Sequence, residues 1–102
     1  MRARLFLFTT LPAVVLPLTA AAQVNAPDCV DVGREAPYRG YGYTHIVVVQ
    51  NQCGAAVRCR VATDVDPAWQ SVTVAAGETG RVVTRSGSPA SAFQPRAECT
   101  QQ

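Results

Sequence analysis

The fold is decided by HIVVVQNQC (residues 45–53), GAA (54–56) and VRCRVAT (57–63), which follow one another without interruption. In residues 57–63, apolar or small side chains alternate with Arg58 and Arg60, as in an antiparallel strand with one solvated side. Residues 46–49 are apolar on both faces, which favours a central strand with a partly covered outer face. We therefore expect two adjacent strands joined by a tight connection, with a cysteine near each inner end.

Shorter segments of the same kind surround this pair. Residues 77–80 contain two glycines and predict a turn, so the strands on either side of them are expected to form a hairpin. Pro95 confines a last strand to a sheet edge or a bend. Residues 23–27 are expected to be a loose lead-in and residues 33–42 a loop. The expected strands are residues 28–32, 43–52, 57–63, 69–75, 81–85 and, as a sixth, 92–99.

These patterns predict an all-β protein, since no helical period extends over ten residues after position 22. Five to six short strands with frequent turns indicate a small antiparallel β-sandwich or open barrel, stapled by disulfides. A domain of this size buries a smaller fraction of its surface than a large domain does, and cross-links are the usual remedy.

The N-terminal segment has the organisation of a signal peptide. Arg2 and Arg4 precede the apolar run Leu5–Leu18, and small residues follow, with cleavage best placed before Gln23. A membrane anchor is the alternative, but the apolar run is shorter than the roughly 20 residues of a spanning helix. We predict a cleaved signal peptide at 1–22 and a single exported β-domain at 23–102. The mature chain is then periplasmic or secreted, with no membrane span.

Signal cleavage changes the charge balance. The chain has nine basic and seven acidic residues, and all the basic residues are arginines. Removing Arg2 and Arg4 leaves seven against seven, a net charge near zero. Nucleic-acid binding requires a basic excess, so nucleic acid is not expected as a partner.

The cysteines indicate an oxidising compartment, because all of them follow the export signal. If residues 54–56 form a hairpin loop, Cys53 and Cys59 lie on one face and close together. Proximity thus favours Cys53–Cys59, which leaves Cys29–Cys99 to join the first strand to the last. The competing pattern, Cys29–Cys53 with Cys59–Cys99, remains open. The four cysteines expected in disulfides are Cys29, Cys53, Cys59 and Cys99.

No residue pattern predicts catalysis, a metal or a cofactor. His45 is the only histidine, and no spacing connects it to a serine and an aspartate. A zinc site formed by His45, Cys53 and Cys59 departs from the usual ligand spacing. Asp64 and Asp66 lack the further oxygen ligands of a calcium loop, and turn capping explains them better.

Tyrosines are concentrated just before the first long strand. Tyr38, Arg39, Tyr41 and Tyr43 stand among glycines, and exposed tyrosine with arginine is typical of binding hot spots. Alternatively, Tyr41 and Tyr43 extend the core face of the strand and cover one end of the core. Trp69 presents the same choice between a lid on the core and an exposed anchor.

The expected function is that of a small exported non-catalytic β-domain with a binding or structural role. Its partner is expected to be another protein or a cell-envelope component. The alternative is a secreted inhibitor or toxin-like effector that displays one loop from a disulfide scaffold.

Overall fold

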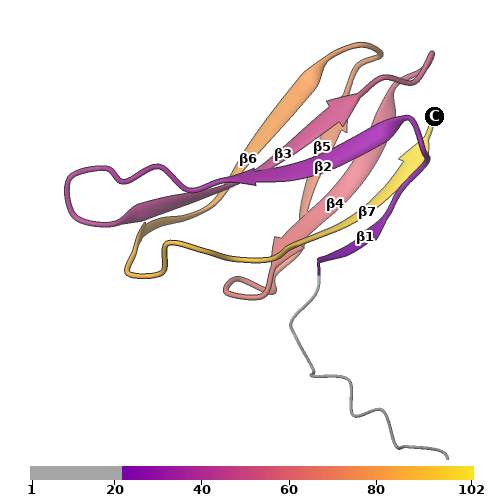
Figure 1. The fold of residues 1–102 in the computed structure, drawn as a ribbon. Coiled ribbons are helices and arrows are strands. Elements are labelled where there is room, and N and C mark those ends of the chain that lie inside the picture. Colours follow the sequence, from indigo (N-terminus) through magenta and orange to yellow (C-terminus); the bar gives the residue numbers. More distant parts are fainter. Residues whose placement is uncertain (1–21) are drawn as a thin grey trace, which may run out of the picture.

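The computed structural model describes residues 22–102, which form two packed β-sheets (Figure 1). One sheet, called sheet A, has the strand order β1-β7-β4-β5, and the other, sheet B, has the order β2-β3-β6. All neighbouring strands are antiparallel except β1 and β7, which are parallel. The strands are β1 (Gln23–Asn25), β2 (Val30–Glu35), β3 (Tyr43–Asn51), β4 (Val57–Thr63), β5 (Gln70–Val74), β6 (Thr79–Ser88) and β7 (Pro95–Gln101).

The predicted fold class is confirmed: the described chain is all-β, in two mostly antiparallel sheets with two disulfides. Two local expectations were wrong. The expected loose lead-in contains β1, which pairs with Arg96–Glu98 of β7. The expected loop at 33–42 begins later, because β2 continues to Glu35. The signal peptide predicted for residues 1–22 lies outside the described residues, apart from Ala22.

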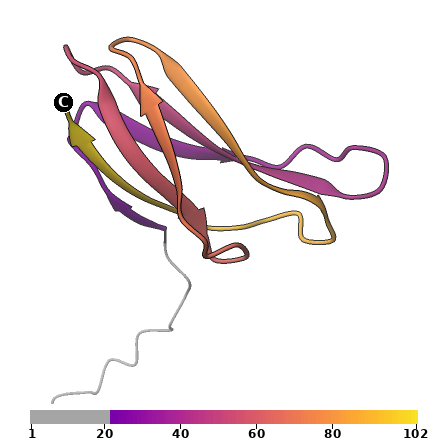
Figure 2. The same ribbon diagram turned by 180° about the vertical axis from the view of Figure 1, so that it is seen from behind.

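Both predicted hairpins, one in the central segment and one around residues 77–80, were wrong. β3 does not pair with β4, and β5 does not pair with β6, because each of these connections passes from one sheet to the other. The physical reason is that β3 already has two neighbours: β2 lies along one edge and β6 along the other. β4 is likewise central in its own sheet, between β5 and β7 (Figures 1 and 2).

The expectation of a central strand with a covered outer face is confirmed for β3. Val47 and Val49 are fully buried in the core, and Ile46 and Val48 on the outer face are also buried. Arg81 lies opposite Val48 and Glu35 opposite Ile46, and these two charged side chains form an ion pair with an Nε–Oε1 distance of 3.2 Å. Their aliphatic stems thus extend across β3 and shield its outer face.

Between the sheets, the predicted alternation of β4 places its valines, Cys59 and Thr63 inside, and leaves Arg58 and Arg60 exposed. Phe93, just before β7, is the largest fully buried side chain. Pro95 is the first residue of β7. Because β7 lies between β1 and β4, the edge position, one of the two predicted alternatives for Pro95, was wrong. The missing N–H of Pro95 is tolerated because it is the first residue of the strand and β1 pairs only with the residues after it.

All four cysteines form disulfides, but the pairing favoured by proximity was wrong. Cys29 bonds to Cys53 and Cys59 bonds to Cys99. The first bond closes the base of the β2–β3 hairpin, and the second joins directly opposed residues of β4 and β7. Proximity failed because β3 and β4 belong to different sheets. The loop-entropy model could not have distinguished the two disulfide connectivities. The summed stabilisation that it gives for each differs by less than about 1 kcal/mol.

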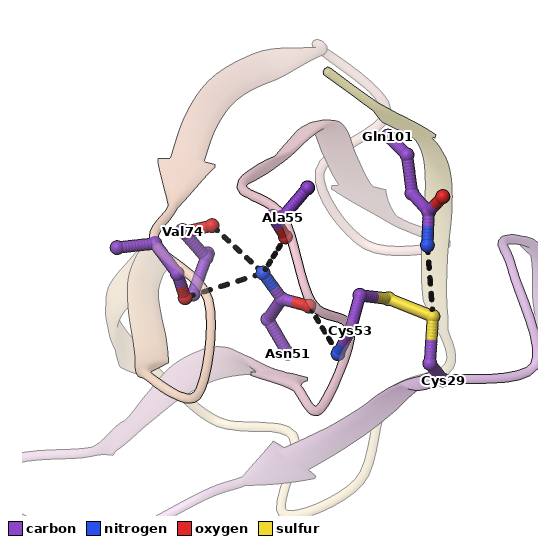
Figure 3. The surroundings of a disulfide bond; sticks show 7 residues. Cys29, Asn51, Cys53, Ala55, Val74 and Gln101 are labelled. Carbon is purple, nitrogen blue, oxygen red and sulfur yellow. Dashed lines mark hydrogen bonds between the residues drawn. A yellow bond between two sulfur atoms is a disulfide. The ribbon is translucent and has the colours of Figure 1, made fainter.

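At the end of β3, Asn51 connects the two sheets through its buried side chain (Figure 3). Its Nδ2 donates to the carbonyl oxygens of Ala55 and Val74 at 3.0 Å and of Ala75 at 3.2 Å, and its Oδ1 accepts from the N–H of Cys53 at 2.9 Å. The amide thus joins β3 of sheet B to the end of β5 in sheet A. We call this network, with the adjacent Cys29–Cys53 disulfide, the Asn51 end.

Candidate functional site

The connection between β2 and β3 is a projecting hairpin, and we call residues 36–43 the tyrosine hairpin. Figures 1 and 2 show that it extends beyond the rest of the two sheets. Tyr41 is 83% exposed and Tyr38 is 63% exposed, whereas Tyr43 is half-buried. Arg39 is exposed and has no ion-pair partner within residues 22–102. Tyr38 and Tyr41 therefore do not cover the core.

Internal contacts hold the tyrosine hairpin in one shape. Tyr38 and Tyr43 form an isolated bridge, and their rings meet edge to face with centroids 5.2 Å apart. The N–H of Arg39 donates to the carbonyl oxygen of Gly42 at 2.8 Å, and the N–H of Thr44 donates to that of Pro37 at 2.9 Å. The exposed rings thus project from an ordered backbone.

Two glycines allow the tyrosine hairpin to lie against β6. A Cβ atom on Gly42 would be 2.6 Å from the carbonyl carbon of Gly87, so the two backbones touch. Gly87 has a φ of +69°, and a Cβ atom there would be 2.8 Å from a ring carbon of Tyr41. Only glycine can adopt this positive φ without strain and also leave room for the Tyr41 ring. The placement of the Tyr41 ring therefore depends on a residue 46 positions away in the chain.

Trp69 lies apart from the tyrosines, on the outer face of sheet A just before β5. It is 44% exposed, and the guanidinium carbon of Arg60 is 4.9 Å from the centroid of its ring. Arg60 also forms an ion pair with Glu98 of β7. The expected lid on the inner core is therefore not what the structure shows. The tryptophan instead lies over the arginine side of β4.

His45 is fully buried and stacks on Phe93, with ring centroids 4.5 Å apart. Its Nε2 is 2.8 Å from the carbonyl oxygen of Ala90, so Nε2 donates its proton there. Nδ1 is buried and has no hydrogen-bond partner among the described residues. The ring thus fills the core and connects β3 to the segment before β7. The zinc arrangement does not form, because Cys53 and Cys59 are both in disulfides.

The side chains of the two aspartates after β4 bind distant segments, so they do not cap their own turn as was predicted. Oδ1 of Asp64 accepts from the N–H of Gln94 at 2.7 Å, and Asp66 forms an ion pair with Arg85 at 2.9 Å. Thr63 Oγ1 accepts from the N–H groups of Val65 and Asp66, which closes the turn itself. Within residues 22–102, no group of three or more His, Cys, Asp or Glu side chains is placed to hold a metal ion.

Sequence reasoning missed the outer face of sheet A as a polar surface. The side chains on this side include Arg58 from β4, Glu98 from β7, Ser71 from β5 and Asn25 from β1. These residues border a shallow depression of about 390 Å³. The alternation of β4 was the only available signal, because sequence alone does not tell which strands flank it.

Comparison with protein-family models, with curated proteins and with solved structures finds no match. In the part of the chain that the structure describes, no helix is long and apolar enough to cross a membrane.

Proposed function

We propose that this chain is an exported, non-catalytic binding domain whose working surface is the tyrosine hairpin. The observation that carries the proposal is the exposure of Tyr41, 83%, at the end of a projecting and internally bonded hairpin. Tyrosine and arginine are the residues that most often dominate binding energy in protein interfaces. The partner would be another protein or a proteinaceous component of the cell envelope.

The order of the tyrosine hairpin supports this proposal. A loop that is already held in its bound shape loses less conformational entropy when it binds. The edge-to-face contact of Tyr38 with Tyr43 and the closure of the hairpin by Thr44 and Pro37 provide such order. Tyrosine adds large contact area with few rotatable bonds.

Export belongs to the same proposal. We take residues 1–22 as a signal peptide that is removed, so that the domain of residues 23–102 is released outside the cytoplasm. The two disulfides support an oxidising location, since such bonds persist mainly in periplasmic and extracellular proteins. Mass spectrometry of the mature protein, expected to begin at Gln23 with no free thiols, tests this part.

The non-catalytic character is supported by the position of His45. A catalytic base must reach the substrate, whereas this ring is fully buried and donates to the carbonyl of Ala90.

A secreted inhibitor or effector is the second candidate. It is favoured by the projection of the tyrosine hairpin beyond the sheets, because a convex loop fits the cleft of an enzyme. The two candidates share one surface and differ in the partner: an inhibitor lowers the activity of the enzyme that it binds, and a structural binder does not.

A photo-crosslinking experiment tests the proposed surface. A benzophenone amino acid replaces Tyr41 in one variant and Val83 in the control, because Val83 is a 51% exposed apolar residue on β6. We expect a discrete crosslinked partner from position 41 in the producing cells, and its loss when Tyr38 is also changed to Ala. Equal crosslinking from both positions, or none from position 41, would contradict the proposal. An activity assay of the captured partner then separates inhibitor from binder.

A further inference from the structure

The outer face of sheet A carries an excess of positive charge, although residues 23–102 contain equal numbers of basic and acidic side chains, seven of each. Arg58, Arg60 and Arg96 point outward from β4 and β7, and Glu98 is the one acidic side chain among these outward positions of the two strands. Asp28, Asp31 and Glu35 lie in or just before β2, at the edge of the other sheet. Within residues 23–102, whose basic and acidic side chains balance, this face therefore has a local positive excess. Such a face attracts anionic groups.

Arg58 is the cation of this face that lines the depression without an ion-pair partner among the described residues. Its side chain is exposed and has no ion-pair partner within residues 22–102, and it borders the 390 Å³ depression together with Ser71 and Thr100. A guanidinium can bind a carboxylate through two parallel hydrogen bonds. The neighbouring hydroxyls both donate and accept, which suits the hydroxyl groups of a ligand.

Trp69 provides an apolar surface beside this charge. It borders a second depression of about 270 Å³, and Asn25 and Glu98 line both depressions, so the two are adjacent. Arg60 is fixed between the two, since it pairs with Glu98 and lies on the indole of Trp69. The rest of the indole, with 44% of the residue exposed, is open to a flat ligand.

We propose that the outer face of sheet A binds an acidic polysaccharide, with a uronate-type sugar as the unit that it recognises. The C–H face of one sugar ring would pack on Trp69, and the carboxylate of a neighbouring unit would bind Arg58. The hydroxyls would bind Ser71, Thr100 and Asn25. Two adjacent depressions fit a chain of sugars better than a single small anion. Because Arg60 is paired with Glu98, Arg58 is the arginine of the depression that is left to bind an anionic group.

The single tryptophan makes a direct binding assay available, because Trp69 lies in the proposed site. The probes are tetragalacturonate and its fully methyl-esterified form, which has the same rings without the charge. We expect the acidic form to change the tryptophan fluorescence and to bind at least about tenfold more tightly than the ester, and to bind less tightly as salt screens the charges. No fluorescence or calorimetric signal at about 10 mM tetragalacturonate would overturn the proposal.

Two variants locate the binding. Arg58→Gln should weaken tetragalacturonate binding about five- to tenfold. The control Arg81→Gln removes the same charge from the exposed outer face of sheet B and should leave the affinity unchanged. Trp69→Ala, followed by calorimetry, should weaken binding by about tenfold or more. Equal effects of the two arginine variants would overturn the assignment to sheet A, and so would full affinity in Trp69→Ala.

Other polyanions complete the test. Poly-glutamate and a single-stranded oligonucleotide carry comparable charge without sugar hydroxyls at the same positions. We expect both to bind more weakly than tetragalacturonate. Tighter binding of poly-glutamate would replace the saccharide by an acidic protein, and tighter binding of the oligonucleotide would replace it by a nucleic acid. Either result contradicts the proposal. Arg58→Gln keeps this comparison valid if Trp69→Ala fails to fold, since Arg58 is exposed.

Discussion

β3 connects two ends of the molecule that are built in opposite ways. At its last residue, Asn51 is fully buried and its side chain bonds to four backbone groups beside a disulfide. At its first residue, Tyr43 begins a strand that follows a hairpin with two exposed tyrosines. The Asn51 end holds the sheets together, and the tyrosine hairpin contributes little to their packing. Stability and binding should therefore respond to different substitutions.

The largest effect on stability is expected from the substitution Asn51→Asp at the Asn51 end. The carboxylate has the same shape but cannot donate, so it would face the carbonyl oxygens of Ala55, Val74 and Ala75 in a buried position. We expect a loss of about 4 kcal/mol in the free energy of unfolding, measured by chemical denaturation. Gln50→Glu is the control, because it makes the same chemical change at the preceding, exposed residue. A similar loss in both variants would show that the Asn51 network is not the cause.

Removal of the neighbouring disulfide should come next. In Cys29→Ala/Cys53→Ala, the unfolded chain regains the freedom of a loop with a sequence separation of 24. The loop-entropy model gives about 3.5 kcal/mol for this change. Denaturation of the double variant measures it, and the binding partner of the tyrosine hairpin should still be captured below the transition. Loss of capture in the folded double variant would show that the two ends are coupled.

A smaller effect on stability is expected from Gly87→Ala, which alters the tyrosine hairpin from β6. The left-handed backbone disfavours alanine by about 1–2 kcal/mol, and the added methyl group displaces the ring of Tyr41. Gly54→Ala is the matched control, since nothing lies within 4 Å of a Cβ atom there. We expect crosslinking from the hairpin to fall only in Gly87→Ala. Unchanged crosslinking would show that the position of Tyr41 is not fixed by β6.

The smallest effect on stability belongs to Tyr41→Ser. The side chain is 83% exposed, so the free energy of unfolding should change by less than about 0.5 kcal/mol. Capture of the partner should nevertheless be lost. This combination, measured by denaturation and by pull-down on the same preparation, sharpens the contrast between the two ends. A loss of stability above about 1 kcal/mol would instead place Tyr41 among the residues that hold the fold.

All the strands except β1 could be predicted from the sequence, but their partners could not. Alternation in Val57–Thr63 and the apolar run in β3 fixed which faces are buried, because side-chain period depends only on local backbone geometry. The assignment of β3 and β4 to different sheets depends on β6 and β7, which are distant in the chain. The error in strand pairing then produced the error in disulfide pairing.

The candidate sites were likewise predictable where they depend on local sequence and not where they depend on strand pairing. The tyrosine hairpin was visible as a local concentration of Tyr, Arg and Gly, although the contact of Tyr41 with Gly87 was not. Trp69 was visible as a residue, but its position over Arg60 depends on the β4–β5 register. The polar face of sheet A needs four strands side by side, and no local pattern contains that information.

The disulfides also determine how the chain matures. Each one joins consecutive cysteines, Cys29 to Cys53 and Cys59 to Cys99, so the two covalent loops do not overlap in sequence. A chain oxidised from its N-terminus as it emerges would therefore reach the native pairing by joining each second thiol to the one before it. The first loop is complete before Cys59 is present, and no bond has to be broken by thiol–disulfide exchange. For a chain oxidised in this order, we expect an oxidant to be sufficient for native pairing, without an isomerase.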